Sequence, residues 1–183
     1  DESRSMAVPP REVERMFLPR DCYRASQAVP GIVLTPMLAD RSYRIQASFE
    51  WQAGDEGTVF SLGDRFSGLV VFVEEGALHC IYQWWFNPKE LAPIPLSAGA
   101  QSFCFDYLAT GERKGQGTLV LNGQTHSSGI DLSPSLLRIT GGLNVGRSRR
   151  LGVAERLAAR GEFPYTGTVS RVRVEPGALA AKT

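Results

Sequence analysis

The chain has 183 residues, of which 43% are hydrophobic and 21% charged, and this composition predicts one globular domain with a sizeable core. Its net charge of +1 gives no electrostatic reason to expect a nucleic acid or a membrane as partner. The longest apolar run, residues 69–73, is far shorter than the roughly 20 residues of a membrane-spanning helix.

The start of the chain lacks the basic and then apolar order of a signal peptide. The three cysteines are an odd number without paired spacing, which is typical of free thiols in a reducing compartment. A cytoplasmic location is therefore expected.

Residues 1–41 predict an irregular N-terminal arm with one short helix. Val13, Met16 and Phe17 recur at helical spacing after a pair of prolines that can open the helix. Apolar residues between positions 32 and 38 predict that the arm packs on the rest of the domain. Later prolines break anything longer (Pro19, Pro30 and Pro36).

The body of the domain, residues 42–176, begins with the clearest element. Apolar and polar residues alternate strictly over residues 43–52, with Tyr43 to Trp51 on one face and Arg44 to Gln52 on the other. Because successive side chains of a strand point to opposite sides of a sheet, this pattern predicts a half-buried strand.

Further short strands follow, separated by glycine-rich turns. The pair Asn122-Gly123 predicts a hairpin, since both positions of that turn need positive φ. One internal helix is expected at 153–160, ended by Gly161, and residues 177–183 form a tail. The expected strands are 58–62, 68–73, 77–85, 102–108, 117–121, 124–127 and 168–175. Many short strands with almost no helix predict an all-β sandwich of the concanavalin A-like jelly-roll type.

Four segments resemble one family. They are DRSYRIQASFEW (40–51), GTVFSLGDRFSGLVVFVEEGALHCIYQ (57–83), GQGTLVLNGQ (115–124), and LNVGRSRR (143–150) followed by FPYTGTVSRVRVE (163–175). In this order they resemble the C-terminal, laminin-G-like domain of large bacterial arylsulfatases, over roughly residues 30–176. The resemblance implies a β-sandwich that accompanies a sulfatase catalytic domain.

The catalytic half of such a sulfatase has no counterpart in the chain. The family's activity needs a Cys or Ser in a C/S-x-P-x-R context, and none of Cys22, Cys80 and Cys104 lies in one. The chain also has Ser148 where the family tends to have an acidic residue after V-G-R. This departure puts any role of that acidic residue in doubt.

Acid/base candidates are few. Glycosidases on this fold need two carboxylates flanking the scissile bond, and here Glu50 and Asp106 lie on different predicted strands. His79 completes the set of catalytic candidates, although a structural or surface role is the usual one for such residues. The histidines lack metal-ligand spacing, so neither a metal nor a cofactor is expected.

An aromatic run, residues 82–86, is the most unusual stretch. On a strand Tyr82, Trp84 and Phe86 would share one face and Trp85 would lie on the other. A sandwich cannot bury both faces without cover, so the run together with Trp51 predicts a ligand-binding or partner surface. The alternative is plain packing under the N-terminal arm.

Five arginines cluster between residues 147 and 160, with only Glu155 among them as an acidic neighbour. Such a cluster can clamp an acidic partner or a carboxylate ligand, or it is simply a solvated loop. Of these we take Arg147 and Arg149 as ligand-binding candidates. The five are Arg147, Arg149, Arg150, Arg156 and Arg160.

The polar faces of several strands can form one concave surface. Arg44 and Glu50 lie on the first long strand, Asp106 on a middle one, and Arg171 and Arg173 on the last. In concanavalin-like folds the first and last strands are commonly neighbours, so these side chains are expected on one sheet, where a sugar or small ligand can bind. A solvated sheet with cross-strand ion pairs is the alternative.

Two hypotheses for the function follow. The first is a non-catalytic binding or assembly module, with a glycan, a small molecule or a sulfatase-like catalytic domain as partner. The alternative is a freestanding small-molecule enzyme, a cyclase, isomerase or hydrolase, working through Glu50, Asp106 and His79. The oligomeric state stays open.

Overall fold

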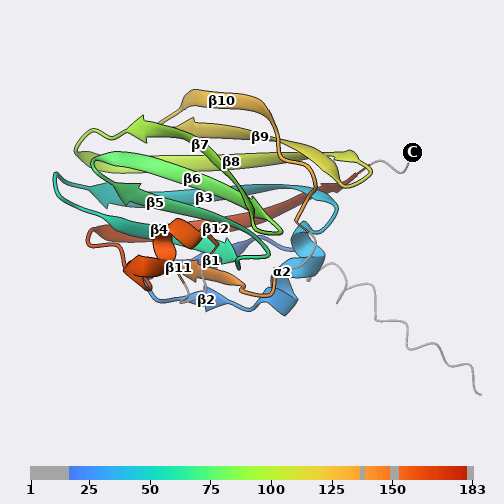
Figure 1. Cartoon of the computed structure of the whole chain (residues 1–183), viewed down its shortest axis with the longest axis horizontal. Helices are drawn as coiled ribbons and strands as arrows, with labels where there is room; N and C mark the ends of the chain where they lie inside the picture. The colour runs from blue at the N-terminus through green and yellow to red at the C-terminus, as the bar shows by residue number, and fades with distance from the viewer. Residues whose placement is uncertain (1–16, 137–138, 149–152, 181–183) are drawn as a thin grey trace, which may run out of the picture.

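The computed structural model describes residues 17–136, 139–148 and 153–180 (Figure 1). The described elements, in chain order, are β1 (Arg20–Cys22), β2 (Ala28–Val29), α2 (Gly31–Leu38), β3 (Arg41–Trp51), β4 (Gly57–Gly63), β5 (Ser67–Glu74), β6 (Ala77–Trp84), β7 (Asn87–Pro95), β8 (Gly99–Gly111), β9 (Lys114–Leu121), β10 (Gln124–Asp131), β11 (Leu143–Val145), the 3₁₀ helix η1 (Glu155–Arg160) and β12 (Thr168–Leu179). The helix predicted around Val13 and Met16 lies outside the described residues.

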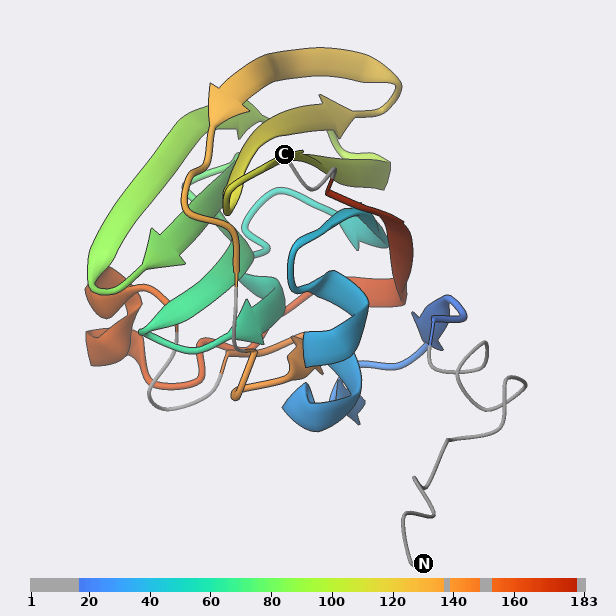
Figure 2. The same cartoon turned by 90° about the vertical axis from the view of Figure 1, so that its right-hand side faces the viewer.

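The strands form two six-stranded sheets packed face to face, as seen along the strands in Figure 2. We name the sheet with the order β1-β12-β3-β8-β9-β10 sheet I, and the sheet with the order β2-β11-β4-β5-β6-β7 sheet II. This arrangement confirms the predicted all-β jelly-roll sandwich. Among the described residues, no helix is both long and apolar enough to cross a bilayer.

The inner faces of the two sheets supply the main core. Along β3 every second side chain, from Tyr43 to Trp51, is buried, while those between them point outward. The strand predicted at 43–52 is thus confirmed as β3. It pairs with β12 on one side and β8 on the other, so the expected adjacency of the first and last long strands is also confirmed.

The predicted hairpin at Asn122-Gly123 is confirmed as well. Leu121 pairs with Gln124, and the two turn residues have φ of 52° and 78°. Asparagine and glycine tolerate this left-handed backbone, which brings β9 and β10 together at the edge of sheet I.

Three expectations are wrong. The strand predicted at 77–85 ends at Trp84, so Phe86 does not share its face; Trp85 and Phe86 instead form a turn. Pro36 does not stop a helix, because α2 continues to Leu38 and is held by the burial of its apolar side chains. The helix predicted at 153–160 is a shorter 3₁₀ helix, although Gly161 ends it as expected, with φ of 67°.

A second, small core lies on the outer face of sheet II. Val70, Phe72 and Ile81 point outward from β5 and β6 and are covered by the segment that contains η1. Their cover consists of Val153, Ala154, Leu157 and Phe163. Because both of its faces are buried, β5 has the continuous apolar sequence that distinguishes it from the alternating β3.

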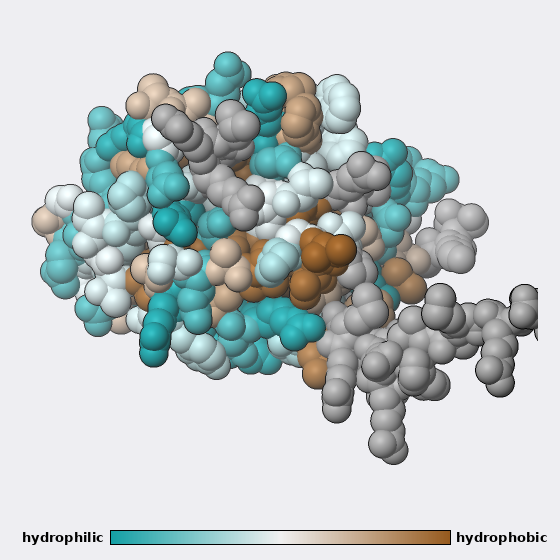
Figure 3. All heavy atoms as spheres, turned by 90° about the horizontal axis from the view of Figure 1, so that it is seen from below, coloured by the Kyte–Doolittle hydropathy of each residue, from teal (hydrophilic) through white to brown (hydrophobic). Residues whose placement is uncertain are grey.

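The helix α2 lies at one end of the sandwich and packs Leu34, Met37 and Leu38 into the main core. This supports the expected contact between the arm and the body. Its other side is open, with Ile32 85% exposed. In the view from below, hydrophobic surface forms a patch on this side of the molecule (Figure 3).

Candidate functional site

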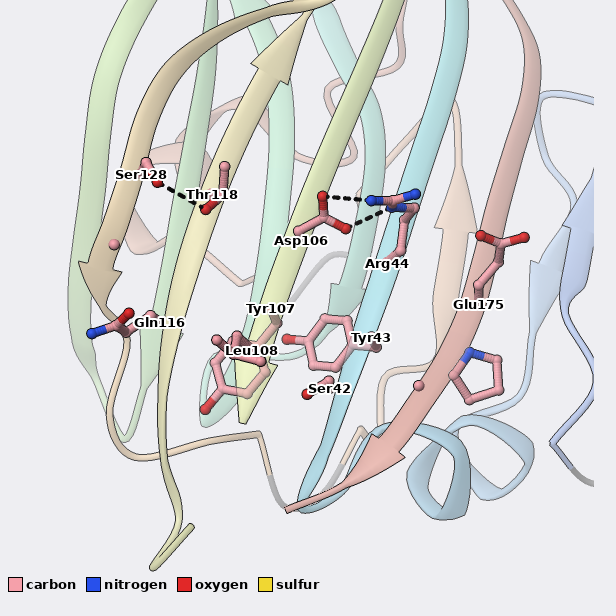
Figure 4. Close-up of a pocket in the computed structure, with 13 residues that line it drawn as sticks. Ser42, Tyr43, Arg44, Asp106, Tyr107, Leu108, Gln116, Thr118, Ser128 and Glu175 are labelled. Carbon is pink, nitrogen blue, oxygen red and sulfur yellow. Dashed lines mark hydrogen bonds and ion pairs between the residues drawn. The ribbon is translucent and has the colours of Figure 1, made fainter. Parts of the chain in front are cut away.

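A hollow of about 500 Å³ lies on the outer face of sheet I (Figure 4). It crosses β3, β8, β9, β10 and β12, so its floor consists of hydrogen-bonded strands. Side chains on such strands are held more rigidly than side chains on loops, which suits a preformed binding site. The polar side chains that line it include Ser42, Arg44, Asp106, Gln116, Thr118, Ser128 and Glu175.

An ion pair occupies the middle of the hollow. Arg44 donates from Nε and Nη2 to the two carboxylate oxygens of Asp106, at 2.6 and 3.0 Å. The pair forms because Arg44 on β3 lies directly opposite Asp106 on β8 in the strand register. Hydrogen bonding to Asp106 raises the pKa of Arg44, so the guanidinium is charged at every physiological pH.

A second carboxylate lies beside the ion pair. Glu175 on β12 lies opposite Arg44 on its other side and accepts a 2.5 Å hydrogen bond from Arg173 Nε. Arg173 and Arg171 both pair with Asp21 of β1, beside the hollow. The lining therefore carries fixed donors and acceptors, with one guanidinium and two carboxylates in the hollow itself and the partner of Glu175, Arg173, outside the lining.

The opposite side of the hollow is neutral. Thr118 and Ser128 have hydroxyl groups 3.5 Å apart, and Gln116 lies on the same face of β9. Leu108 is 58% exposed and adds apolar surface. Hydroxyls, an amide, a guanidinium and carboxylates around one leucine can bind a ligand rich in hydroxyl groups, which both donate and accept hydrogen bonds.

The structure does not bring the three acid/base candidates together. Glu50 and Asp106 lie on the same face of sheet I, but they are far apart. Asp106 lies opposite Arg44, and Glu50 is six positions along β3 from Arg44, a distance of about 20 Å. Glycosidase carboxylates lie about 5–10 Å apart. His79 is on the opposite side of the molecule, stacked on Phe72 with a centroid distance of 4.9 Å.

The aromatic ligand candidates also separate. Trp51 is buried between the sheets and donates from Nε1 to the carbonyl of Asp55 at 3.1 Å. Tyr82 and Trp84 line a smaller pocket of about 350 Å³ between the β6–β7 hairpin and residues 131–134. Trp85 lies outside it on the turn and is 66% exposed.

The arginine cluster is largely paired with the protein's own carboxylates. Arg156 binds Glu74 and Glu90 at 2.7 and 3.0 Å, and Arg160 binds Glu56 at 2.9 Å. These ion pairs fasten η1 to sheet II. Arg147 lies 3.5 Å from Glu162, while Arg149 and Arg150 are outside the described residues.

The cysteines are poor nucleophiles. Burial, and then the neighbouring Asp106, raise the pKa of Cys104 from 9.0 to about 11, and burial also raises the pKa of Cys22 and Cys80. A two-unit increase lowers the thiolate fraction near neutral pH about 100-fold. Among the described residues, no group of three or more His, Cys, Asp or Glu side chains could hold a metal ion.

We expect slow thiol labelling of the native protein as a result. Near pH 8 a disulfide reagent should react with Cys104 about 100-fold more slowly than with free cysteine, and the rate should rise as the pH approaches about 11. Unfolded protein is the control and should label fast. Rapid labelling of native Cys104 would contradict the raised pKa.

The sequence matches no family model and no curated protein. Solved structures do match. The carbohydrate-binding module CBM40 of the Ruminococcus gnavus IT-sialidase, bound to α2,6-sialyllactose, superposes with a TM-score of 0.57 at 14% identity, covering 90% of this chain and 94% of that one. The likeness shows the fold.

Two further structures have the same architecture. Domains LG4-5 of the mouse laminin α1 chain match with a TM-score of 0.53 at 16% identity, over 85% of this chain and 40% of that one. The NanB sialidase of Streptococcus pneumoniae matches with a TM-score of 0.57 at 10% identity, over 90% of this chain and 27% of that one. The sandwich is therefore of the lectin-like jelly-roll type, and these structures do not single out the arylsulfatase domain.

Sequence reasoning placed Arg44 and Asp106 on one polar face but missed most of the hollow. Gln116, Thr118, Ser128 and Glu175 carry no motif. The one signal in the sequence is that they alternate with buried residues such as Leu119, which places them on outward faces of their strands. Those faces become a site only when β8, β9 and β12 assemble around β3.

Proposed function

We propose that this domain is a non-catalytic glycan-binding module and that the hollow on sheet I is its binding site. The observation that carries the proposal is the set of polar side chains fixed around the Arg44–Asp106 pair on five adjacent strands. The fold likeness to a module bound to sialyllactose supports it. The separation of Glu50, Asp106 and His79 supports binding over catalysis.

The charges favour a neutral saccharide. Binding a sugar carboxylate would call for an arginine free of protein carboxylates, but Arg44 already makes two hydrogen bonds to Asp106. Glu175 adds a second negative group nearby. Ligand hydroxyls can bind such a surface, because each can donate to a carboxylate or accept from the guanidinium.

Calorimetry with neutral and sialylated oligosaccharides tests the site. We expect neutral glycans to bind, sialylated forms to bind no more tightly, and Arg44→Ala to weaken binding about tenfold or more, since hydrogen bonds to charged groups are lost. Arg171→Ala is the matched control: it removes an arginine–aspartate pair from the same face but outside the hollow. Equal affinity of wild type and a folded Arg44→Ala protein would overturn the proposal.

We also infer that the domain belongs to a larger, sulfatase-like protein. The motifs at residues 40–51 and 163–175 support this, because they resemble the C-terminal domain of bacterial arylsulfatases. The domain would then hold glycan near a catalytic unit that it does not itself contain.

A further inference from the structure

Four hairpins of the sandwich have two-residue turns in which both residues have positive φ: 75–76, 85–86, 112–113 and 122–123. Such turns favour asparagine and glycine, because other side chains are strained there. The turns at 75–76 and 122–123 have glycine in second place. The turns at 85–86 and 112–113 lack glycine: Trp85 has φ of 46° and Phe86 of 60°, and Glu112 and Arg113 have 48° and 60°. Backbone strain of this kind clusters at functional sites, and of the two turns only the one at 85–86 presents large apolar side chains.

The strained turn belongs to an exposed aromatic cluster. The backbone N–H of Trp85 donates to the carbonyl of Phe66 at 2.6 Å, which joins the β6–β7 turn to the β4–β5 turn. The ring of Phe66 lies 5.7 Å from that of Trp85 and 5.0 Å from that of Phe86. These three residues, the aromatic tip, are 40%, 66% and 52% exposed.

One arginine borders the aromatic tip, and a second lies over Trp84, the residue before Trp85 in the chain. The guanidinium of Arg65 lies 5.2 Å from the ring of Phe66 and 5.6 Å from that of Phe86, and Arg113 lies 5.2 Å from the ring of Trp84. In the part of the chain that the structure describes, neither arginine has a carboxylate partner. The nearest acids in sequence are engaged elsewhere: Asp64 accepts from the backbone N–H of Phe66 and from Thr140, and Glu112 binds Lys114.

We infer that the aromatic tip inserts into the headgroup region of an anionic phospholipid bilayer. Tryptophan and phenylalanine suit the boundary between headgroups and acyl chains, and unpaired arginines suit lipid phosphates. A standard protein interface takes roughly 20–30 residues a side, so an apolar surface as small as these three rings favours shallow insertion into a bilayer over a protein partner. The net charge of +1 gave no reason to expect a membrane partner, because a sum over the whole chain does not show where arginines and aromatic residues gather on the surface.

The test is cosedimentation with vesicles of phosphatidylcholine and phosphatidylserine in a ratio of about seven to three. Wild type should bind, with its tryptophan emission quenched by brominated phosphatidylcholine, and should bind at least about fivefold more weakly without phosphatidylserine. The double variant Trp85→Asn, Phe86→Gly should lose at least about tenfold of the binding. Because Asn-Gly is the favoured pair for this turn, the variant should melt at the same or a higher temperature, so misfolding would not explain the loss.

Tyr23→Asn is the matched control, since it removes an aromatic side chain that is 59% exposed elsewhere, and it should bind like wild type. Three results would each overturn the inference. In the first, the wild type does not bind vesicles. In the second, the double variant binds them as well as the wild type does. In the third, the wild type forms a dimer that the double variant does not form, and neither protein binds vesicles. Glycan binding in the hollow does not depend on these residues, so the two proposals fail separately.

Discussion

Replacement of Phe105 by alanine is expected to lower the free energy of unfolding by about 3–5 kcal/mol. Phe105 is fully buried on β8, between Ile45 of β3 and Leu119 of β9 in the strand register, and its ring lies 6.2 Å from that of Tyr43. Removal of the ring leaves a cavity that rigid sheets cannot close, so the surrounding side chains lose their contacts. Chemical denaturation measures the loss.

Leu108→Ala is the matched control on the same strand. Leu108 points outward and is 58% exposed, so its truncation should change the free energy of unfolding by no more than about 0.5 kcal/mol. If both substitutions lowered the free energy of unfolding by similar amounts, Phe105 would not point into the core with Leu108 pointing to solvent.

Gly141→Ala should destabilise the domain by about 3 kcal/mol or more. A Cβ atom at this position would lie 1.8 Å from the carbonyl oxygen of Gly63 and 2.4 Å from its carbon. The next residue, Gly142, accepts a hydrogen bond from Gly63 N–H at 2.8 Å, so the two backbones cannot separate without loss of that bond. The substitution therefore forces β11 away from β4. Thermal unfolding is the measurement.

Gly123→Ala is the control that distinguishes a steric clash, as at Gly141, from the strain of a positive φ alone. Gly123 has φ of 78° but open space around its Cα, so alanine there should cost only about 1–2 kcal/mol. A smaller effect at Gly141 than at Gly123 would contradict the close packing of the two backbones.

The hollow and the aromatic tip occupy different parts of the sandwich. The hollow is on the outer face of sheet I, whereas the aromatic tip consists of two turns of sheet II. A module anchored by its turns would leave the face of sheet I open to a glycan. Each surface can be removed by substitution without touching the other.

The strand pattern was readable because burial on one face of a sheet imposes a period of two, as in β3. The sequence does not predict β7, because its prolines hide the strand pattern. Pro88, Pro93 and Pro95 argue against a strand, but an edge strand can lack N–H donors on its open side. The sequence predicts strand for the turn at 85–86 because tryptophan and phenylalanine are strand formers, and nothing local reveals positive φ.

The sequence by itself determined the class of fold, the inward faces of the long strands and the polar face that holds Arg44 and Asp106, because these follow from local alternation. Only the tertiary structure decided which charges meet. The partners of Arg156 and Arg160 are glutamates 66–104 positions away, and the pairing of β12 with β3 places Glu175 opposite Arg44. Cross-strand register joins residues distant in the chain, so the hollow exists only in the assembled sheet.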